Sequence, residues 1–147
     1  MTKSTNPDAV RGPSGIWNEN ILPVVEWEAA EHRVVLPSDL QHALGIATPV
    51  LRWDRSKREA VLREHLHDAA VIHAINDHLL TWTEAGSERD KPENHRILFT
   101  VERRFYAVSI GKRRDGSDSI IIVFGSSSRS FRSNRLRGMV NVVERGK

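Results

Sequence analysis

The feature that most constrains the fold is a change of hydrophobic period part-way along the chain. From about residue 55 to residue 82, apolar side chains recur at helical spacing without proline or glycine. This pattern predicts one long helix, or two shorter helices broken near His67-Asp68. Beyond it the period is that of strands, with apolar runs at 96–101, 105–110 and 120–124. The sequence therefore predicts an α+β fold, with a long helix packed on a C-terminal antiparallel sheet.

Shorter signals complete the expected secondary structure. Asp115-Gly116 lies between the last two strand runs and predicts a tight hairpin turn. Gly45 is placed to end a short helix. Residues 84–94 are polar and contain Gly, Ser, Asp and Pro, which is typical of a loop. The other expected elements are strands at 21–25, 33–36, 50–53 and 139–143 and the helix at 37–45.

The length of 147 residues suits a single domain around one core. Residues 1–15 contain Asn-Pro, Gly-Pro and Ser-Gly pairs and have no hydrophobic period, which predicts a flexible leader. Residues 16–147 are then expected to form the α+β domain, in which the short N-terminal elements precede the long helix. From about residue 126 the chain is rich in serine and arginine, and we expect a basic, partly flexible tail.

Composition excludes several classes of function. The chain has no cysteine, which excludes disulfides, thiolate catalysis and cysteine-bound zinc or iron–sulfur clusters. It has no apolar run of the length that a membrane-spanning helix needs, and its first residues lack the apolar core of a secretory signal. The motifs of P-loop NTPases, dinucleotide-binding folds and α/β-hydrolases are absent. We therefore expect a cytoplasmic protein with no membrane partner.

Positive charge is concentrated in the last third of the chain. Residues 101–147 carry 11 Lys and Arg against four acids, a balance of +7, whereas the whole chain has a net charge of +3. Such a basic, arginine-rich segment suggests a phosphate-bearing partner such as nucleic acid, although a solvated basic face or a nonspecific tail would have the same composition. The expected nucleic-acid contacts are Arg103, Lys112, Arg113, Arg114, Arg129, Phe131, Arg132 and Arg135. Phe131 would stack on a base.

Histidines on the predicted helix are the candidates for acid–base chemistry. Helical geometry places His65 and Asp68 on one face, so that the carboxylate can orient the imidazole, and it points His67 elsewhere. The alternative is that both histidines are polar residues near a helix end. His73 and Asp77 are spaced as a metal pair, but no third ligand accompanies them, so we predict no metal site and no cofactor.

Histidine and arginine together contain the groups that a metal-independent ribonuclease requires. Such an enzyme needs a base for the ribose 2′-hydroxyl, an acid for the leaving 5′-oxygen and a cation for the phosphorane. Histidines supply the acid and the base, and arginine supplies the cation.

Residues 50–131 resemble the nuclease domains of the barnase–EndoU–colicin–RelE ribonuclease superfamily. The matching segments are residues 62–67 with their two histidines, Arg103-Arg104-Phe105-Tyr106, the Asp115-Gly116 hairpin and residues 122–127. The resemblance implies that His65 or His67 is the acid–base residue and that Arg104 stabilises the phosphorane. It also implies that Ser127 or Ser128 positions the scissile phosphate.

The leading hypothesis is therefore a metal-independent endoribonuclease, acting as a toxin of a conflict or phage system on cellular RNA such as tRNA. The first alternative is a non-catalytic protein that binds RNA or DNA through the same basic sheet and Arg/Ser tail. The second is a protein-interaction module with an acidic partner such as an inhibitor or immunity protein.

Overall fold

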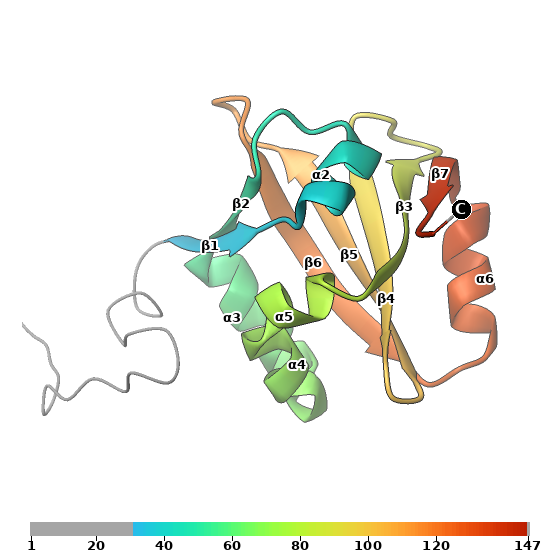
Figure 1. Cartoon of the computed structure of the whole chain (residues 1–147). Helices are drawn as coiled ribbons and strands as arrows, with labels where there is room; N and C mark the ends of the chain where they lie inside the picture. The colour runs from blue at the N-terminus through green and yellow to red at the C-terminus, as the bar shows by residue number, and fades with distance from the viewer. Residues whose placement is uncertain (1–30, 147) are drawn as a thin grey trace, which may run out of the picture.

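A seven-stranded mixed sheet organises the part of the chain that the structure describes, and short helices pack against it (Figure 1). The computed structural model describes residues 31–146, so the leader and the strand expected at 21–25 lie outside the described residues. The elements in chain order are β1 (Glu31–Val35), α2 (Ser38–Leu44), β2 (Val50–Asp54), α3 (Arg55–Glu64), the 3₁₀ turn η1 (Leu66–Asp68), α4 (Ala69–His73), α5 (Ile75–Leu79), β3 (Trp82–Glu88), β4 (His95–Val101), β5 (Arg104–Lys112), β6 (Asp118–Ser126), α6 (Ser130–Arg137) and β7 (Met139–Glu144).

The strands lie in the order β1-β2-β6-β5-β4-β3-β7. The neighbours pair antiparallel except β2 and β6, which run parallel with Arg52 opposite Ser119. The expectation of an antiparallel sheet is thus right for its C-terminal part and incomplete as a whole. The antiparallel pair of β1 and β2, which are connected through α2, adds two strands to the β6 side of that sheet.

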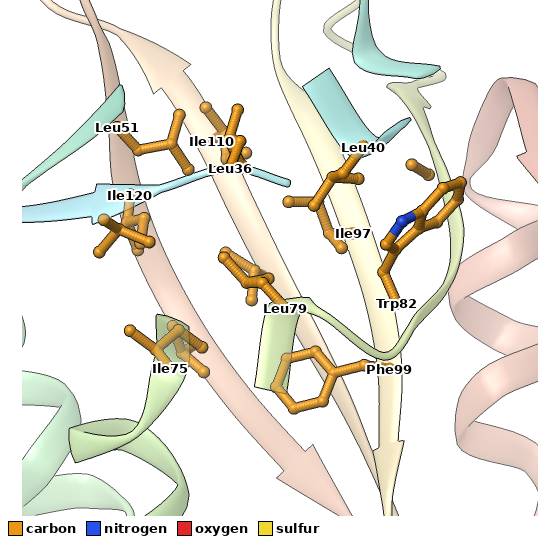
Figure 2. Packing of buried hydrophobic residues seen from close by; sticks show 14 of the residues in the cluster. Leu36, Leu40, Leu51, Ile75, Leu79, Trp82, Ile97, Phe99, Ile110 and Ile120 are labelled. Carbon is orange, nitrogen blue, oxygen red and sulfur yellow. The ribbon is translucent and has the colours of Figure 1, made fainter. Parts of the chain in front are cut away.

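The main core fills the space between α2–α5 and one face of the sheet, which we call the inner face (Figure 2). Leu40 from α2, Ile75 and Leu79 from α5 and inward apolar side chains of the strands, such as Leu51, Ile97 and Ile110, are fully buried there. On the opposite, outer face, α6 packs Phe131 onto β4, β5 and β6 in a second, smaller cluster. The sheet therefore has helices on both faces, although α6 covers the outer face only in part.

The expectation of one long helix over residues 55–82 is wrong. The helix is broken at His65, whose φ of −126° and ψ of 46° are not helical, and η1, α4 and α5 follow as short separate turns. The alternative of a break near His67-Asp68 describes the chain better. The helical period survives because each short helix still turns its apolar side chains, such as Ile72 and Ile75, into the same core.

Two segments expected to be irregular are ordered elements. The first half of the expected loop at 84–94 forms β3, which lies between β4 and β7. The Ser/Arg-rich segment after residue 126 forms α6 and β7. Gly45 ends α2 in the left-handed conformation at φ 70°, as predicted, and Asp115-Gly116 turns the hairpin between β5 and β6. None of the described helices is long and apolar enough to cross a membrane.

Candidate active site

A group of polar side chains gathers where η1 meets the first residues of β5 and the last residues of β6. The break in the helix brings η1 against the sheet, and the strand period of two places Arg104 and Tyr106 on the same, inner face of β5. Both side chains meet Asp68, whose exposed fraction is 4%. Three elements that are distant in sequence therefore converge on one buried carboxylate.

Asp68 is the centre of this group. The Tyr106 hydroxyl donates to its Oδ1 at 2.7 Å, and Arg104 donates from Nη2 to its Oδ2 at 3.1 Å. The Nε of Arg104 lies 2.7 Å from Oδ1 as an ion-pair contact without the geometry of a hydrogen bond, so the positive charge of the guanidinium lies close to both carboxylate oxygens. This charge-assisted hydrogen bond and the ion pair hold the guanidinium against the carboxylate.

The contacts explain the ionisation of the group. Burial alone would raise the pKa of Asp68, but the hydrogen bonds from Arg104 and Tyr106 and the nearby positive charge outweigh it, and the pKa lies below its ordinary value. Burial, followed by the hydrogen bond to Asp68, raises the pKa of Tyr106 to about 12. The hydrogen bond to Asp68 also raises the pKa of Arg104. At neutral pH the centre is thus a carboxylate, a guanidinium and a neutral phenol.

Tyr106 is held in place by its neighbours. Its ring stacks on Phe99 at 5.2 Å between centroids, and Gly125 lies opposite it in β6. A Cβ at residue 125 would come within 2.6 Å of the Tyr106 ring, so the ring occupies the space that only glycine leaves open. Tyr106 was not among the predicted site residues. The signal was its position two residues after Arg104 in a strand, which places both on one face.

His67 does not point away from Asp68 as continuous helical geometry predicts. Because the backbone turns at His65, the Nε2 of His67 lies 3.3 Å from Oδ2 of Asp68 and 2.8 Å from Nη2 of Arg104. The side chain of His67 is 64% exposed, so it is accessible from solvent. His65 keeps the predicted pairing in a looser form, with Nδ1 at 4.0 Å from Oδ2 of Asp68. The two imidazole rings are 6.4 Å apart.

The Nη2 of Arg104 has more hydrogen-bond acceptors around it than hydrogens to donate. It lies within hydrogen-bond distance of Asp68 Oδ2, His67 Nε2 and, at 3.2 Å, the carbonyl oxygen of Gly125. An NH₂ group of a guanidinium has two hydrogens to donate. The bond to His67 can therefore be released without leaving that nitrogen unpaired, and while the bond is formed, Nε2 of His67 acts as the acceptor and carries no proton.

Three further predicted residues lie near this end of the sheet. Arg103 is exposed in the turn between β4 and β5, next to Arg104. Ser127 and Ser128 directly follow Ser126, which pairs with Phe105 of β5. Both Ser127 and Ser128 are exposed. The amide of Ser128 donates to Oγ of Ser126 at 3.0 Å.

Three of the predicted basic residues lie at the other end of β5. Lys112 is eight residues beyond Arg104, a distance of about 26 Å along an extended strand. Its ammonium group lies 3.2 Å from Asp118, and Arg113 lies 3.3 Å from Asp54. Arg114 is exposed in the hairpin turn. These residues do not join the group around Asp68.

The predicted residues of the tail have mixed surroundings. Arg129 is exposed just before α6, but Phe131 is only 8% exposed and packs in the second cluster, which leaves it no open face for stacking on a base. Arg132 pairs with the buried Glu84 of β3. Arg135 lies over the rings of Phe124 and Phe131, at 5.1 Å from each.

Comparisons with protein families, with curated proteins and with solved structures find no match. Among residues 31–146, no three His, Asp or Glu side chains are grouped so that they could hold a metal ion. The groups available for chemistry at this site are two imidazoles, a fixed guanidinium and nearby hydroxyls.

Proposed function

We propose that the protein is a metal-independent endoribonuclease of the type found in the barnase–EndoU–colicin–RelE superfamily. The observation that carries the proposal is the convergence of His65, His67 and Arg104 on the buried carboxylate of Asp68. An accessible imidazole beside a fixed guanidinium is the pairing that general base catalysis on a phosphodiester requires.

His67 is suited to be the general base. Its Nε2 accepts a hydrogen bond from Arg104, which selects the neutral imidazole with the proton on Nδ1. In the proposed reaction Nε2 takes the proton of a ribose 2′-hydroxyl, and the 2′-oxygen attacks the adjacent phosphorus. The proton that Nε2 gains is then stabilised by Asp68, 3.3 Å away.

His65 is suited to be the general acid. The centroid of its ring is 6.4 Å from that of His67, close enough for both imidazoles to act on one phosphate group, and Asp68 faces its Nδ1. In the proposed step His65 donates a proton to the 5′-oxygen as the P–O5′ bond breaks. The products are a 2′,3′-cyclic phosphate and a free 5′-hydroxyl.

Arg104 is proposed to stabilise the charge of the phosphorane. Asp68 holds its guanidinium through one Nη2 hydrogen, while the Nη2 hydrogen that bonds to His67 is passed to a phosphate oxygen. Binding of the phosphate would thus free Nε2 of His67 at the moment the base is needed. Ser127 and Ser128 are proposed to contact the nonbridging oxygens.

The first test incubates the purified protein with total RNA and tRNA in EDTA. We expect discrete cleavage by the wild type, none by His65→Ala/His67→Ala, and full activity in His42→Ala, which removes an exposed histidine of α2 as a matched control. Intact RNA with the wild type would refute the proposal. RNA that is intact but shifted on a native gel would favour the non-catalytic nucleic-acid-binding alternative, and RNA that is intact and unshifted would favour an acidic protein partner.

The second test separates the two histidines. A substrate with a good leaving group, such as uridine 3′-(4-nitrophenyl phosphate), needs no general acid. We expect His65→Ala to cleave it nearly as fast as the wild type and His67→Ala to remain inactive. The opposite pattern would reverse the two roles.

A further inference from the structure

A row of three nearly parallel rings leads across the inner face of the sheet to the candidate active site. Phe99 of β4 and Tyr106 of β5 are register partners, and their rings stack at 5.2 Å with an interplanar angle of 10°. The imidazole of His78, from α5, stacks on Phe99 at 6.0 Å with an angle of 2°. Both separations lie in the range in which aromatic rings attract each other. Because Tyr106 donates to Asp68, direct contacts connect His78 to the buried carboxylate of the site.

His78 is the outermost ring of this row. Phe99 and Tyr106 are only 1% and 3% exposed, whereas His78 is half-buried. One face of the imidazole covers Phe99, so the opposite face is the one that solvent can reach. Among residues 31–146, none donates a hydrogen bond to this imidazole or accepts one from it. The ring is therefore held by stacking on one side and is available to a flat ligand on the other.

His78 and the candidate site lie on the same face of the sheet and at the same end of it. Val101 is two residues beyond Phe99, so the period of the strand places it on the inner face as well. It is half-buried, packs against the main core and is the register partner of Arg104. The apolar side chains of Phe99 and Val101 thus lie between the imidazole of His78 and the guanidinium of Arg104.

We propose that His78 is a stacking site for one base of the RNA strand and that it positions the strand for cleavage beside Arg104. The inference takes RNA as the ligand and in that respect rests on the proposed function. An imidazole whose plane is fixed by a buried phenylalanine can stack on a nucleobase with its other face. Such stacking is tolerant of sequence because every base has a π-face. The site therefore contributes affinity and the register of the strand, and it does not select the identity of the base.

The distance between His78 and Arg104 limits which base can be bound. Steps of 6.0 Å to Phe99, 5.2 Å to Tyr106 and 6.0 Å to the guanidinium carbon place His78 within about 17 Å of that group. At about 3.4 Å per nucleotide in a stacked strand, the base belongs to one of about five nucleotides on one side of the scissile phosphate. Stacking of one base on an aromatic side chain changes affinity by about 5- to 150-fold. Because an imidazole is a small ring, we expect the lower end of that range.

The first experiment measures binding without cleavage, by fluorescence anisotropy on the full chain with His65→Ala/His67→Ala. The probes are a labelled RNA of about 16 nucleotides and a strand of the same length that lacks every base. His78→Leu keeps an apolar side chain over Phe99 and removes the ring, whereas His78→Phe keeps a ring. His42→Leu makes the same substitution at an exposed histidine of α2 as a matched control. Circular dichroism establishes that each variant is folded.

We expect His78→Leu to weaken binding of the RNA about fivefold and to leave the affinity for the baseless strand unchanged. His78→Phe and His42→Leu should bind the RNA as tightly as the parent chain. An equal loss with both strands, or no loss with either, would overturn the proposal. A loss in His78→Phe as large as that in His78→Leu would also overturn it.

The second experiment locates the base by cleavage. A 2′-O-methyl oligonucleotide with one unmodified ribonucleotide has a single cleavable bond, which fixes the register of the strand. We expect His78→Leu to lower kcat/KM about fivefold on this substrate, and to have no effect once a base is removed at the stacked position, within about five nucleotides of that bond. An effect that persists wherever the base is removed would overturn the proposal.

The two experiments separate this site from the proposed function. Cleavage by the wild type with no effect of His78→Leu would refute the stacking site and leave the nuclease standing. Base-dependent binding through His78 without any wild-type cleavage would refute the nuclease and leave the stacking site standing.

Discussion

Replacing Asp68 by asparagine tests whether one buried carboxylate organises the site. Asparagine keeps the size of the side chain and removes its charge, so Arg104 loses the ion pair that fixes it and Tyr106 loses a charged acceptor. Breaking a buried ion pair from one side costs about 3–5 kcal/mol of unfolding free energy. Because the side chain of Arg104 is 27% exposed and water can hydrate part of it, we expect the lower end, about 3 kcal/mol.

Tyr106→Phe separates the hydrogen bond from the packing. The ring and its stack on Phe99 are kept, and only the hydroxyl that donates to Asp68 is lost. A hydrogen bond to a charged group contributes about 1.5–3 kcal/mol. If the hydroxyl acts through Asp68, the two substitutions are not additive, and the double variant loses less stability than the sum of the single losses.

Urea unfolding followed by circular dichroism measures the three free energies, and RNA cleavage measures activity. We expect Asp68→Asn to lose cleavage by at least 100-fold under conditions where it is still folded, on the order of the contribution of general acid–base catalysis. Additive stability losses, or an Asp68→Asn variant with wild-type stability and activity, would refute the view that Asp68 positions Arg104 and His67.

Two more predictions concern the buried imidazole of His32 and the close packing of Gly125 against Tyr106. Burial, aided by nearby positive charge, lowers the pKa of His32 from 6.5 to about 4. The unfolded state therefore takes up the proton first as pH falls, so the free energy of unfolding is highest above about pH 6.5 and decreases by about 3 kcal/mol as pH approaches 4. Urea unfolding over this range should show a weaker dependence of stability on pH for His32→Asn than for the wild type. Gly125→Ala places a methyl group within 2.6 Å of the Tyr106 ring, which should cost about 1–3 kcal/mol and most of the cleavage activity. Stability and activity like those of the wild type would contradict the close packing of that ring.

Local signals in the sequence were sufficient for most of the elements. The runs at 96–101, 105–110 and 120–124 fall within β4, β5 and β6, and the segments at 50–53 and 139–143 fall within β2 and β7. Each of these predictions depended on the period of apolar side chains or on one turn residue. Such signals are contained in a few consecutive residues, so they can be recognised without knowledge of the rest of the chain.

The missed strand β3 had no such local signal. Its polar residues are neutralised by partners distant in sequence, since Glu84 pairs with Arg132 of α6 and Glu88 lies 3.5 Å from Arg96 of β4. The same contacts help to fold the arginine-rich segment that composition alone presents as a tail. Neither the strand nor the tail helix could be predicted from its own residues, because each contributes the charge that the other needs.

The candidate site shows the same division between local and distant information. His65, His67 and Arg104 were recognisable by residue type, and the pairing of His65 with Asp68 followed from helical spacing. The approach of His67 to Asp68 and Arg104 did not, because it requires the backbone to leave the helix at His65. Tyr106 was missed because its value as a hydrogen-bond donor depends on where Asp68 lies in space.

The break in the helix and the site have one physical cause. Asp68 is buried, and a buried carboxylate is tolerated only where donors surround it. Those donors, Arg104 and Tyr106, are on the sheet, so the residues around Asp68 turn out of α3 and form η1 against β5. That turn brings His67 to the guanidinium. A sequence that kept the helix continuous would have to give up the carboxylate, and the histidine would then point away from Arg104.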